Sequence, residues 1–455
     1  MSAPTATSST AASNAEAAVD DPAYVFHSWS AQALIDPLPI AGGEGAWFWD
    51  HEGNRYLDGS SQLVNLNLGH QHPAIVEAIK AQADRLCTVA PTFASDVRGQ
   101  AARMIVERAG AGFAKVFFTN GGAEATENAV RMAKVHTGRH KVLAHYRSYH
   151  GATHGSIALT GDPRRWPSEP SLPGVVHFHG PYPYRSSFGA TTPEEETERA
   201  LAHLDEVLMY EGAHTVAAVI VESVVGTNGI LVPPPGYLAG LAERCRAHGI
   251  LLICDEVMAG FGRCGAWFAF QRFDVQPDLI CFAKGVNSGY VPLGGVVISE
   301  AVAATFAERA YPGGLTYSGH PLACASAVAS MQAFEDEGVL AHVAVLEREV
   351  WGPGLAELAA KHPSVGEVRG IGCFWAIELV RDPATREPLV PYNASGAAAA
   401  PMGELVAACK AGGLWPFTHF NRLHVVPPLV ISVDDARLLL GILDTALDVA
   451  DAHVG

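Results

Sequence analysis

Several kinds of targeting and stabilising signal are missing from this sequence of 455 residues. No apolar run reaches about eighteen residues, so no membrane-spanning helix is expected. The first basic residue is Arg55, which leaves no positively charged region for a secretory signal. The eight cysteines form no Cys-x-x-Cys pair and are expected as buried free thiols in a reducing compartment. We therefore expect a cytoplasmic protein that does not contact a membrane.

Positive charge is also scarce. Lys and Arg total 30 against 47 Asp and Glu, a formal net charge of −17, which argues against a nucleic acid as the main partner. Charged residues make up 17% of the chain and apolar residues 49%, proportions that suit large buried cores rather than a disordered chain. The length allows two or three domains. We interpret the chain as a soluble α/β enzyme.

Short apolar runs alternate with Ala-rich amphipathic stretches over residues 74–330. The predicted strands are Lys115–Thr119, Lys141–His145, Val175–Phe178, Val216–Val221, Ile250–Cys254, Leu279–Phe282 and Val296–Ser299. The predicted helices include Glu124–Val135, Glu194–Leu208, Tyr237–His248 and Pro321–Asp336. This alternation predicts a large domain with a doubly wound, mostly parallel sheet of seven strands and helices on both faces.

The two ends of the chain have a different pattern. Aromatic, alternating runs flank a turn in Ala46–Leu57, which predicts a hairpin. Further predicted elements are strands at Val368–Val380 and Leu423–Val426, helices near Leu340–Ala360, Met402–Ala411 and Asp434–Val449, and a surface loop at Asp382–Ala400. We predict a small α+β domain built from residues 21–73 and 331–455, after a disordered leader at residues 1–20.

Side chains that can carry chemistry follow the predicted strands. In a doubly wound sheet, ligands bind at the carboxyl edge of the strands. The residues expected at that edge are Asn120-Gly121-Gly122-Ala123-Glu124, Tyr149-His150-Gly151, Glu222, Asp255-Glu256 and Lys284-Gly285. A small-residue turn, an aromatic ring, acids and a lysine are therefore expected close together.

The turn that precedes Glu124 puts small residues where a strand meets a helix. Free backbone N–H groups and the positive end of the helix can hold a phosphate at such a turn. The turn matches neither Gly-x-Gly-x-x-Gly nor Gly-x-x-x-x-Gly-Lys-[Ser/Thr], which disfavours a nucleotide site. A plain tight turn that needs glycine is the alternative.

Lys284 and Asp255 are charged residues at the ends of apolar strands. Desolvation favours the neutral amine of Lys284, which can attack a carbonyl and form a Schiff base. The alternative is a lysine whose aliphatic stem packs at the strand end. The carboxylate of Asp255 needs a cationic partner or a proton, and either a pyridinium N–H or Arg263 can be that partner.

Other chemistries have less support in the sequence. His70-x-His72 and His177-x-His179 lack a third ligand at a recognisable spacing, so no metal site is predicted. A Walker-B interpretation of Asp255-Glu256 lacks a matching phosphate loop. The sequence contains no Gly-x-Ser-x-Gly, and no cysteine stands in a recognisable catalytic context.

As a set, these residues resemble the class III, fold type I, pyridoxal-phosphate aminotransferases. The motifs occur in the family's order: Thr119-Asn120-Gly121-Gly122-Ala123-Glu124-Ala125, Tyr149-His150-Gly151, Glu222, Asp255-Glu256-Val257-x-x-Gly260-Phe261-Gly262-Arg263, Ala283-Lys284-Gly285 and Thr316-Tyr317-Ser318-Gly319-His320-Pro321. The resemblance runs from about Ala23 to the C-terminus. The last motif and residues 67–73 look most like ω-amino-acid and amine:pyruvate transaminases, including taurine:pyruvate types.

The resemblance implies a role for each residue of the set. Lys284 would hold pyridoxal phosphate covalently and shuttle a proton, and Asp255 would keep the pyridine nitrogen protonated. Tyr149 and Val257 would lie on the two faces of the ring. The other implied contacts are Gly121, Gly122 and Ala123 with the phosphate, His150 and Glu222 beside the cofactor, Thr316 of a second subunit with the phosphate, and Trp29, Val64, Tyr149 and Arg422 with the substrate.

The sequence departs from the family's pattern in two places. Hydroxyl residues that are usual in the phosphate turn are replaced by Gly121 and Ala123, so backbone N–H groups must contribute more. Amine:pyruvate relatives carry a mobile arginine about ten residues before a Pro-Pro pair, and counting back from Pro427 gives Phe417. Either Arg422 takes this role from another angle, or another group does.

The sequence therefore predicts a homodimer with shared active sites, with a tetramer as the alternative. The predicted reaction moves an amino group from a terminal amine or ω-amino acid to pyruvate or a related keto acid by a ping-pong cycle. The alternatives are a taurine- or β-alanine-type transaminase, a lyase or decarboxylase on the same scaffold, and a binding protein without a cofactor.

Overall fold

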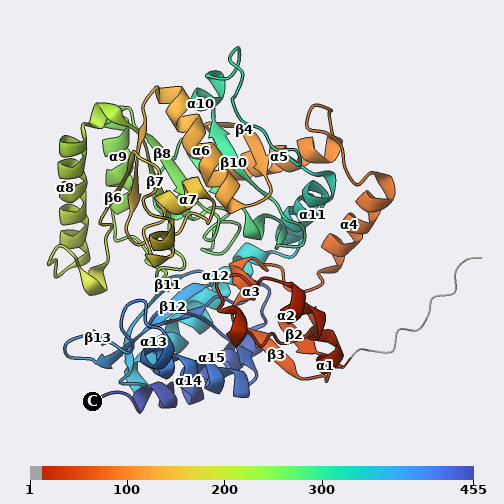
Figure 1. Ribbon diagram of the computed structural model, residues 1–455, viewed down its shortest axis with the longest axis vertical. Coiled ribbons are helices and arrows are strands. Elements are labelled where there is room, and N and C mark those ends of the chain that lie inside the picture. Colours follow the sequence, from red (N-terminus) through yellow and green to blue (C-terminus); the bar gives the residue numbers. More distant parts are fainter. Residues whose placement is uncertain (1–12) are drawn as a thin grey trace, which may run out of the picture.

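The computed structural model describes residues 13–455 and is built around a seven-stranded sheet (Figure 1). The strands are β4 (Phe113–Thr119), β5 (Lys141–His145), β6 (Val175–Phe178), β7 (Val216–Glu222), β8 (Leu251–Asp255), β9 (Leu279–Phe282) and β10 (Gly294–Ser299), in the order β4-β10-β9-β8-β7-β5-β6. Strand β10 is antiparallel to both of its neighbours, and the other neighbouring pairs are parallel. The predicted doubly wound, mostly parallel sheet is confirmed.

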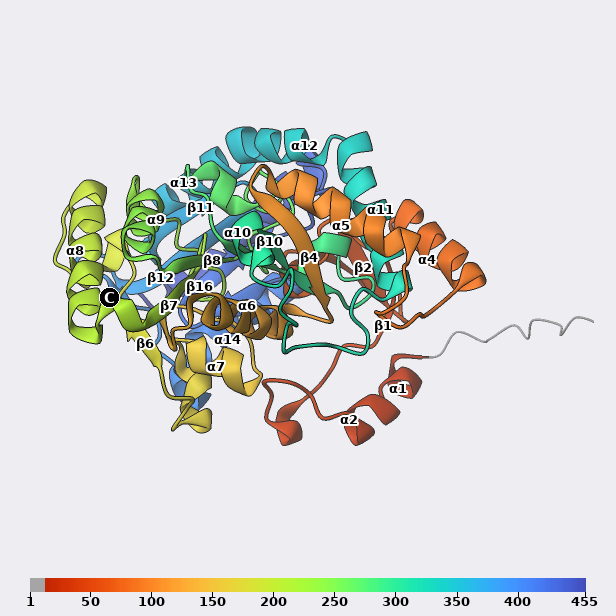
Figure 2. The same cartoon turned by 90° about the horizontal axis from the view of Figure 1, so that it is seen from above.

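Helices cover both faces of this sheet (Figures 1 and 2). They are α4 (Pro73–Arg85), α5 (Asp96–Ala109), α6 (Gly122–Thr137), α7 (His154–Leu159), α8 (Pro193–Glu211), α9 (Tyr237–His248), α10 (Glu300–Ala304) and α11 (Pro321–Asp336). Every residue of β7 is buried, and its side chains alternate between two cores: Val219 packs with residues of α5, α8 and α9, whereas Ile220 packs with residues of α6. Burial on both faces explains why these strands are continuous apolar runs in the sequence.

The N-terminal and C-terminal segments share a second, four-stranded sheet. It consists of β1 (Ile40–Glu44), β2 (Trp47–Asp50), β3 (Arg55–Asp58) and β14 (Leu414–Trp415), and β14 lies parallel to β3. The hairpin predicted within Ala46–Leu57 is present as β2 and β3. A helical turn, α3 (Ser61–Val64), follows. The domain boundaries near residues 73 and 330 stay a prediction.

A third sheet and four helices form most of the C-terminal part. The sheet contains β11 (Val365–Ile371), β12 (Phe374–Asp382), β13 (Glu387–Pro388), β15 (Phe417–His419) and β16 (Arg422–Val425). The helices are α12 (Val339–Leu346), α13 (Gly352–Lys361), α14 (Ala400–Ala411) and α15 (Val433–Asp451). One face of this sheet packs on these helices, and the other packs against residues such as Val224 and Met258 next to the large sheet.

Two expectations for these regions were wrong. The single strand expected at Val368–Val380 is a hairpin, because Gly372 adopts a left-handed conformation (φ +61°) that turns the chain between β11 and β12. Residues 1–12 of the expected disordered leader lie outside the described residues. The remainder contains helix α1 (Asn14–Ala17), in which Ser13 accepts a hydrogen bond from the Glu16 backbone N–H at 3.2 Å.

Within residues 13–455, no helix combines the length and the apolar character needed to cross a membrane. The eight cysteines are all free thiols, and Cys87 is the exposed one among them.

Candidate active site

The carboxyl ends of the parallel strands meet at a cavity of about 260 Å³. It is lined by Gly122, Ala123, Tyr149, His150, Gly151, Ala152, Glu222, Thr227, Asp255, Val257, Met258 and Lys284. Eight of these residues belong to the set predicted at the cofactor, and Gly121 caps helix α6 directly beside them. The edge of the sheet therefore brings together groups that are far apart in the sequence.

Asp255 is the last residue of β8 and is 4% exposed. Its Oδ2 atom accepts a hydrogen bond from His150 Nδ1 at 2.7 Å, and its Oδ1 atom accepts one from the Val257 backbone N–H at 3.0 Å. Arg263, the alternative partner, donates instead to the Pro427 carbonyl (2.6 Å) and to Asn67 Oδ1 (2.7 Å). Asp255 thus lines the cavity with a carboxylate that can accept a further hydrogen bond from a ligand.

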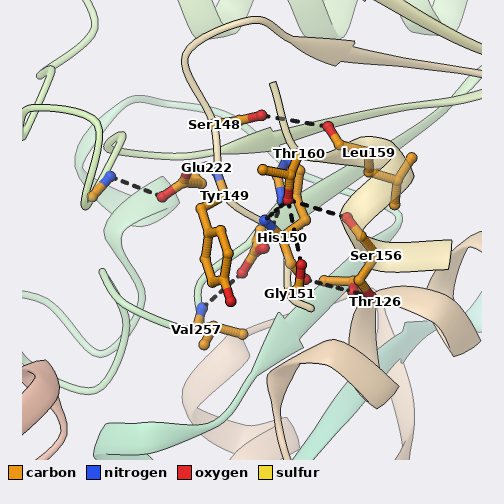
Figure 3. A network of polar contacts seen from close by, with 12 residues as sticks. Thr126, Ser148, Tyr149, His150, Gly151, Ser156, Leu159, Thr160, Glu222 and Val257 are labelled. Atoms are coloured by element: carbon orange, nitrogen blue, oxygen red, sulfur yellow. Dashed lines mark hydrogen bonds and ion pairs between the residues drawn. The ribbon is translucent and has the colours of Figure 1, made fainter. Parts of the chain in front are cut away.

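His150 is held rigidly between two helices and the sheet (Figure 3). Its backbone N–H donates to Thr160 Oγ1 at 3.0 Å, and its carbonyl accepts from Thr126 Oγ1 at 2.9 Å. The ring is buried, and its Nε2 atom has no partner within the described part of the chain. Since Nδ1 contacts the carboxylate, His150 orients Asp255 and limits its freedom to rotate.

Glu222 ends the neighbouring strand β7 and is also buried. Its Oε1 atom accepts from the Tyr149 backbone N–H at 3.0 Å, and its Oε2 atom accepts from the Gly226 backbone N–H at 2.8 Å (Figure 3). Burial raises the pKa of Glu222 to about 7, with a smaller contribution from the charge of Asp255. The carboxyl group of Glu222 can therefore exist in both protonation states near neutral pH.

Lys284 begins the short 3-10 helix Lys284–Asn287 that follows β9. Burial lowers its pKa to about 8, against the opposite effect of Asp255 and Glu222. At pH 7, roughly a tenth of this amine is then neutral, compared with a negligible fraction for an ordinary lysine. The backbone of Lys284 has φ +48°, a strained value for a residue with a side chain, and such strain is concentrated at functional sites.

The start of helix α6 forms one wall of the cavity. The helix begins at Gly122 without a side-chain cap, so its first N–H groups and positive dipole end face a possible anion. A Cβ atom on Gly122 would lie 2.9 Å from Val257 Cγ1, and one on Gly151 would lie 2.6 Å from Ala123 Cβ. These glycines therefore allow a close approach that larger residues would prevent.

This donor set fits the pyridoxal phosphate that the resemblance implies. The open N-terminus of α6 can hold the phosphate, and Asp255 can accept a hydrogen bond from the pyridine nitrogen. Lys284 supplies an amine on the same cavity, and Tyr149 and Val257 supply an aromatic ring and an apolar surface. These residues already lie around one cavity, so the chain needs no rearrangement to hold the cofactor in this way.

The predicted substrate residues Trp29, Val64 and Arg422, and Thr316, which was predicted to contact the phosphate from a second subunit, do not line the cavity. Trp29 is 68% exposed and Thr316 is exposed, and neither lines the cavity of its own chain. Val64 is buried, has φ +56°, and packs in the same apolar cluster as Met258. Arg422 is 2% exposed on β16, outside the residues that line the cavity.

Several residues of the site were missed from the sequence. Thr227 and Met258 line the cavity, but each stands in a loop beyond its strand end and has no distinctive motif. Arg164 places its guanidinium carbon 3.8 Å from the ring centroid of Tyr149. No pattern signals this contact, because it joins a loop to the 3-10 helix Pro163–Ser168, which only the folded chain brings together.

Comparisons with known proteins agree with this geometry. The family model Aminotransferase class-III matches residues 30–447. Taurine–pyruvate aminotransferase of Bilophila wadsworthia is 32% identical over 458 residues, which cover 97% of this chain and 99% of the relative. The structure of taurine:2-oxoglutarate aminotransferase from Bifidobacterium kashiwanohense, in complex with PLP and glutamate, is similar with a TM-score of 0.94 and 43% identity, covering 98% and 99% of the two chains. An (S)-enantioselective omega-transaminase from Thermomicrobium roseum gives a TM-score of 0.89 and 37% identity, covering 96% and 99%.

Replacement of Lys284 tests its covalent role. We expect Lys284→Ala to abolish transamination while the fold persists, because no other amine lines the cavity within residues 13–455. Borohydride reduction followed by peptide mass analysis should trap cofactor on Lys284 in the unmodified enzyme only. Lys134→Ala is a matched control, because burial also lowers the pKa of Lys134 but this residue does not line the cavity. Retained turnover in Lys284→Ala would refute the assignment.

Replacement of Asp255 tests the charge beside the cofactor. We expect Asp255→Asn to lower the turnover rate by orders of magnitude with cofactor still bound, because an amide cannot supply the negative charge that keeps the pyridine nitrogen protonated. Asp278→Asn is the control, since Asp278 accepts from the Leu252 N–H at 2.8 Å at the opposite edge of the sheet. Single-turnover rates for both variants measure the effect. Near-normal rates in Asp255→Asn would show that the charge has no such function.

Proposed function

The chain belongs to the class-III aminotransferases and is a pyridoxal-phosphate-dependent enzyme, and we propose that it moves the amino group of a terminal amine or ω-amino acid to pyruvate or a related keto acid. The reaction proceeds in two half-reactions, so that donor and acceptor occupy the same cavity in turn. Relatives that support the proposal are named for taurine and pyruvate, for taurine and 2-oxoglutarate, and for omega-transamination.

The observation that carries the choice of a keto acid as acceptor is the state of Arg422. Its side chain is 2% exposed, and within residues 13–455 no group accepts a hydrogen bond from its Nε or Nη2 atom. The guanidinium lies 5.2 Å from the ring centroid of Phe420, and burial lowers its pKa to about 10. A buried cation with two unsatisfied nitrogens is costly, and a carboxylate that reaches them would reduce that cost.

Each side chain of the cavity has a different function in the proposed reaction. When bound, pyridoxal phosphate supplies a carbonyl that takes up the amino group and a ring that draws electrons from the substrate carbon. The neutral fraction of the Lys284 amine can accept a proton from the substrate Cα and later give it back. Asp255 would accept a hydrogen bond from the pyridine N–H of the cofactor, and His150 keeps Asp255 in place. Tyr149 and Val257 would contact the cofactor ring as part of the cavity wall.

We also propose that the enzyme is a homodimer with shared active sites. Large apolar side chains are exposed along the N-terminal segment, which lies at the periphery of the molecule around α2 (Asp20–Tyr24) (Figure 2): Tyr24 85%, Phe26 84%, Trp29 68% and Leu34 84%. Exposed aromatic clusters of this kind indicate a covered surface. Thr316 and Trp29, which do not line their own cavity, would reach that of the partner. Light scattering distinguishes a dimer or tetramer, which would support the proposal, from a monomer, which would contradict it.

A panel of amino donors tests the proposed reaction directly. Purified enzyme is incubated with each donor and with pyruvate or 2-oxoglutarate, and formation of alanine or glutamate is measured. Conversion of the bound cofactor to its amine form by donor alone, and its reversal by keto acid alone, would establish the two half-reactions. Absence of amino transfer from every terminal amine and ω-amino acid would overturn the proposed substrate class.

Replacement of Arg422 tests the acceptor site. We expect Arg422→Ala to raise the pyruvate KM by roughly ten- to a hundred-fold, the effect of losing about 1.5–3 kcal/mol of charged hydrogen bonding. A donor without a carboxylate should be affected much less. Arg422→Met retains side-chain volume if the alanine variant unfolds, and Arg437→Ala is a surface control, since Arg437 is 64% exposed. Equal effects on both half-reactions, or none, would make Arg422 structural.

A further inference from the structure

Arg164 lies in the 3-10 helix Pro163–Ser168 and contacts the wall of the cavity through Tyr149. Its guanidinium carbon lies 3.8 Å from the ring centroid of Tyr149, which lines the cavity. The contact is shorter than the usual limit of about 6 Å for a cation–π interaction. The charged end of Arg164 is thus fixed beside the tyrosine that would cover the cofactor.

Asp162 determines the orientation of this guanidinium. The Nε atom of Arg164 donates to Asp162 Oδ2 at 2.9 Å and to Oδ1 at 3.1 Å, and Nη2 also pairs with this carboxylate. Asp162 is fully buried and accepts a further hydrogen bond from Asn228 Nδ2 at 3.1 Å. Asn228 directly follows Thr227, a residue of the cavity wall. Within the described residues no acceptor contacts Nη1, so this end of the fork is open to a ligand.

The charge of Arg164 affects the pKa values of two other residues, Lys284 and His419. It is one of the charges that lower the pKa of Lys284, so it lies within electrostatic reach of the amine that would react. It also contributes, together with Arg422, to the lowered pKa of His419 on β15, where burial is the larger cause. Arg164 is therefore within electrostatic reach of both the reacting lysine and the C-terminal sheet that carries Arg422.

We propose that Arg164 binds the anionic end of the amino donor, so that the preferred donors are ω-amino acids with a terminal sulfonate or carboxylate rather than uncharged amines. This inference rests on the proposed transamination and selects one of its two donor classes. A guanidinium held by a buried carboxylate and an aromatic ring is a fixed donor for anionic oxygens. An uncharged amine would offer Nη1 no anionic acceptor, so it would gain nothing from this charge.

The test compares Arg164→Gln with the neighbouring Arg165→Gln in the cofactor-loaded enzyme. Arg165 is a matched control because it belongs to the same helical turn but donates to Glu169 Oε1 at 2.8 Å. Donors are 2-aminoethanesulfonate, 3-aminopropanoate and propylamine, with pyruvate as acceptor. We expect Arg164→Gln to lower the ratio of kcat/KM for each anionic donor over propylamine by about tenfold or more, and Arg165→Gln to leave it unchanged.

A second measurement does not depend on turnover. The compound 2-hydroxyethanesulfonate carries the anion but no amine, and calorimetry gives its dissociation constant for the cofactor-loaded enzyme. We expect Arg164→Gln to weaken this binding by about tenfold or more, and Arg164→Lys to restore part of it. Arg164→Met, which keeps an aliphatic stem over Tyr149, replaces the glutamine variant if that variant fails to fold.

The remaining outcomes separate the inference from the proposed function. If the unmodified enzyme transaminates the anionic donors and Arg164→Gln leaves their preference unchanged, Arg164 is not the site, and the transaminase proposal stands. If the unmodified enzyme prefers propylamine, the inferred donor class is wrong. If no donor reacts, the proposed function fails together with the inference. A loss confined to 2-aminoethanesulfonate supports a sulfonate site, and one confined to 3-aminopropanoate supports a carboxylate site.

Discussion

Asp255 is a carboxylate with 4% of its surface exposed, at the end of an apolar strand. Its negative charge must be compensated by hydrogen-bond donors or positive charges nearby, and the arrangement of the site depends on which groups provide them. His150 and the Val257 N–H occupy one side of the carboxylate. The other side is available to the cofactor. The same low-dielectric surroundings act on Lys284, where burial outweighs the attraction of the two acids and brings the pKa to about 8. Had the acids prevailed, the amine would stay protonated and could not attack a carbonyl.

The parts of this site that sequence reasoning could predict are those fixed by the sheet itself. Strands such as β7 and β8 are recognisable because burial on both faces requires continuous apolar residues. Parallel strands end at one edge, so the residue after each strand is placed without further information. Asp255, Glu222 and Lys284 were found in this way, and the cavity lining includes all three. The order of the motifs along the chain then indicated pyridoxal phosphate as the cofactor.

Other parts depend on contacts between segments that no local pattern connects. The turn at Gly372 was overlooked because apolar residues stand on both sides of it, so the sequence pattern is that of one continuous strand. Arg263 was the alternative to a pyridinium N–H as the partner of Asp255, but it joins the N-terminal and C-terminal segments through Asn67 and Pro427. Arg164 contacts Tyr149 only because the folded chain brings the 3-10 helix Pro163–Ser168 next to that ring. Such choices are decided by tertiary geometry, which the spacing of residues along the chain does not encode.

A protein with a net charge of −17 is expected to repel an anionic substrate. The repulsion from each charge depends, however, on its distance from the substrate. Surface charges are screened beyond a Debye length of about 8 Å at physiological ionic strength, whereas poorly solvated groups are screened much less. Two arginines near the cavity can act in this way: Arg422 is buried and has no hydrogen-bond acceptor at two of its nitrogens within residues 13–455, and Arg164 lies over Tyr149, which lines the cavity. The cost of desolvating Arg422 is part of the folding free energy, so an anion that reaches it gains a prearranged partner. A buried guanidinium with unsatisfied nitrogens thus lowers stability and, for the same physical reason, strengthens the binding of an anionic substrate.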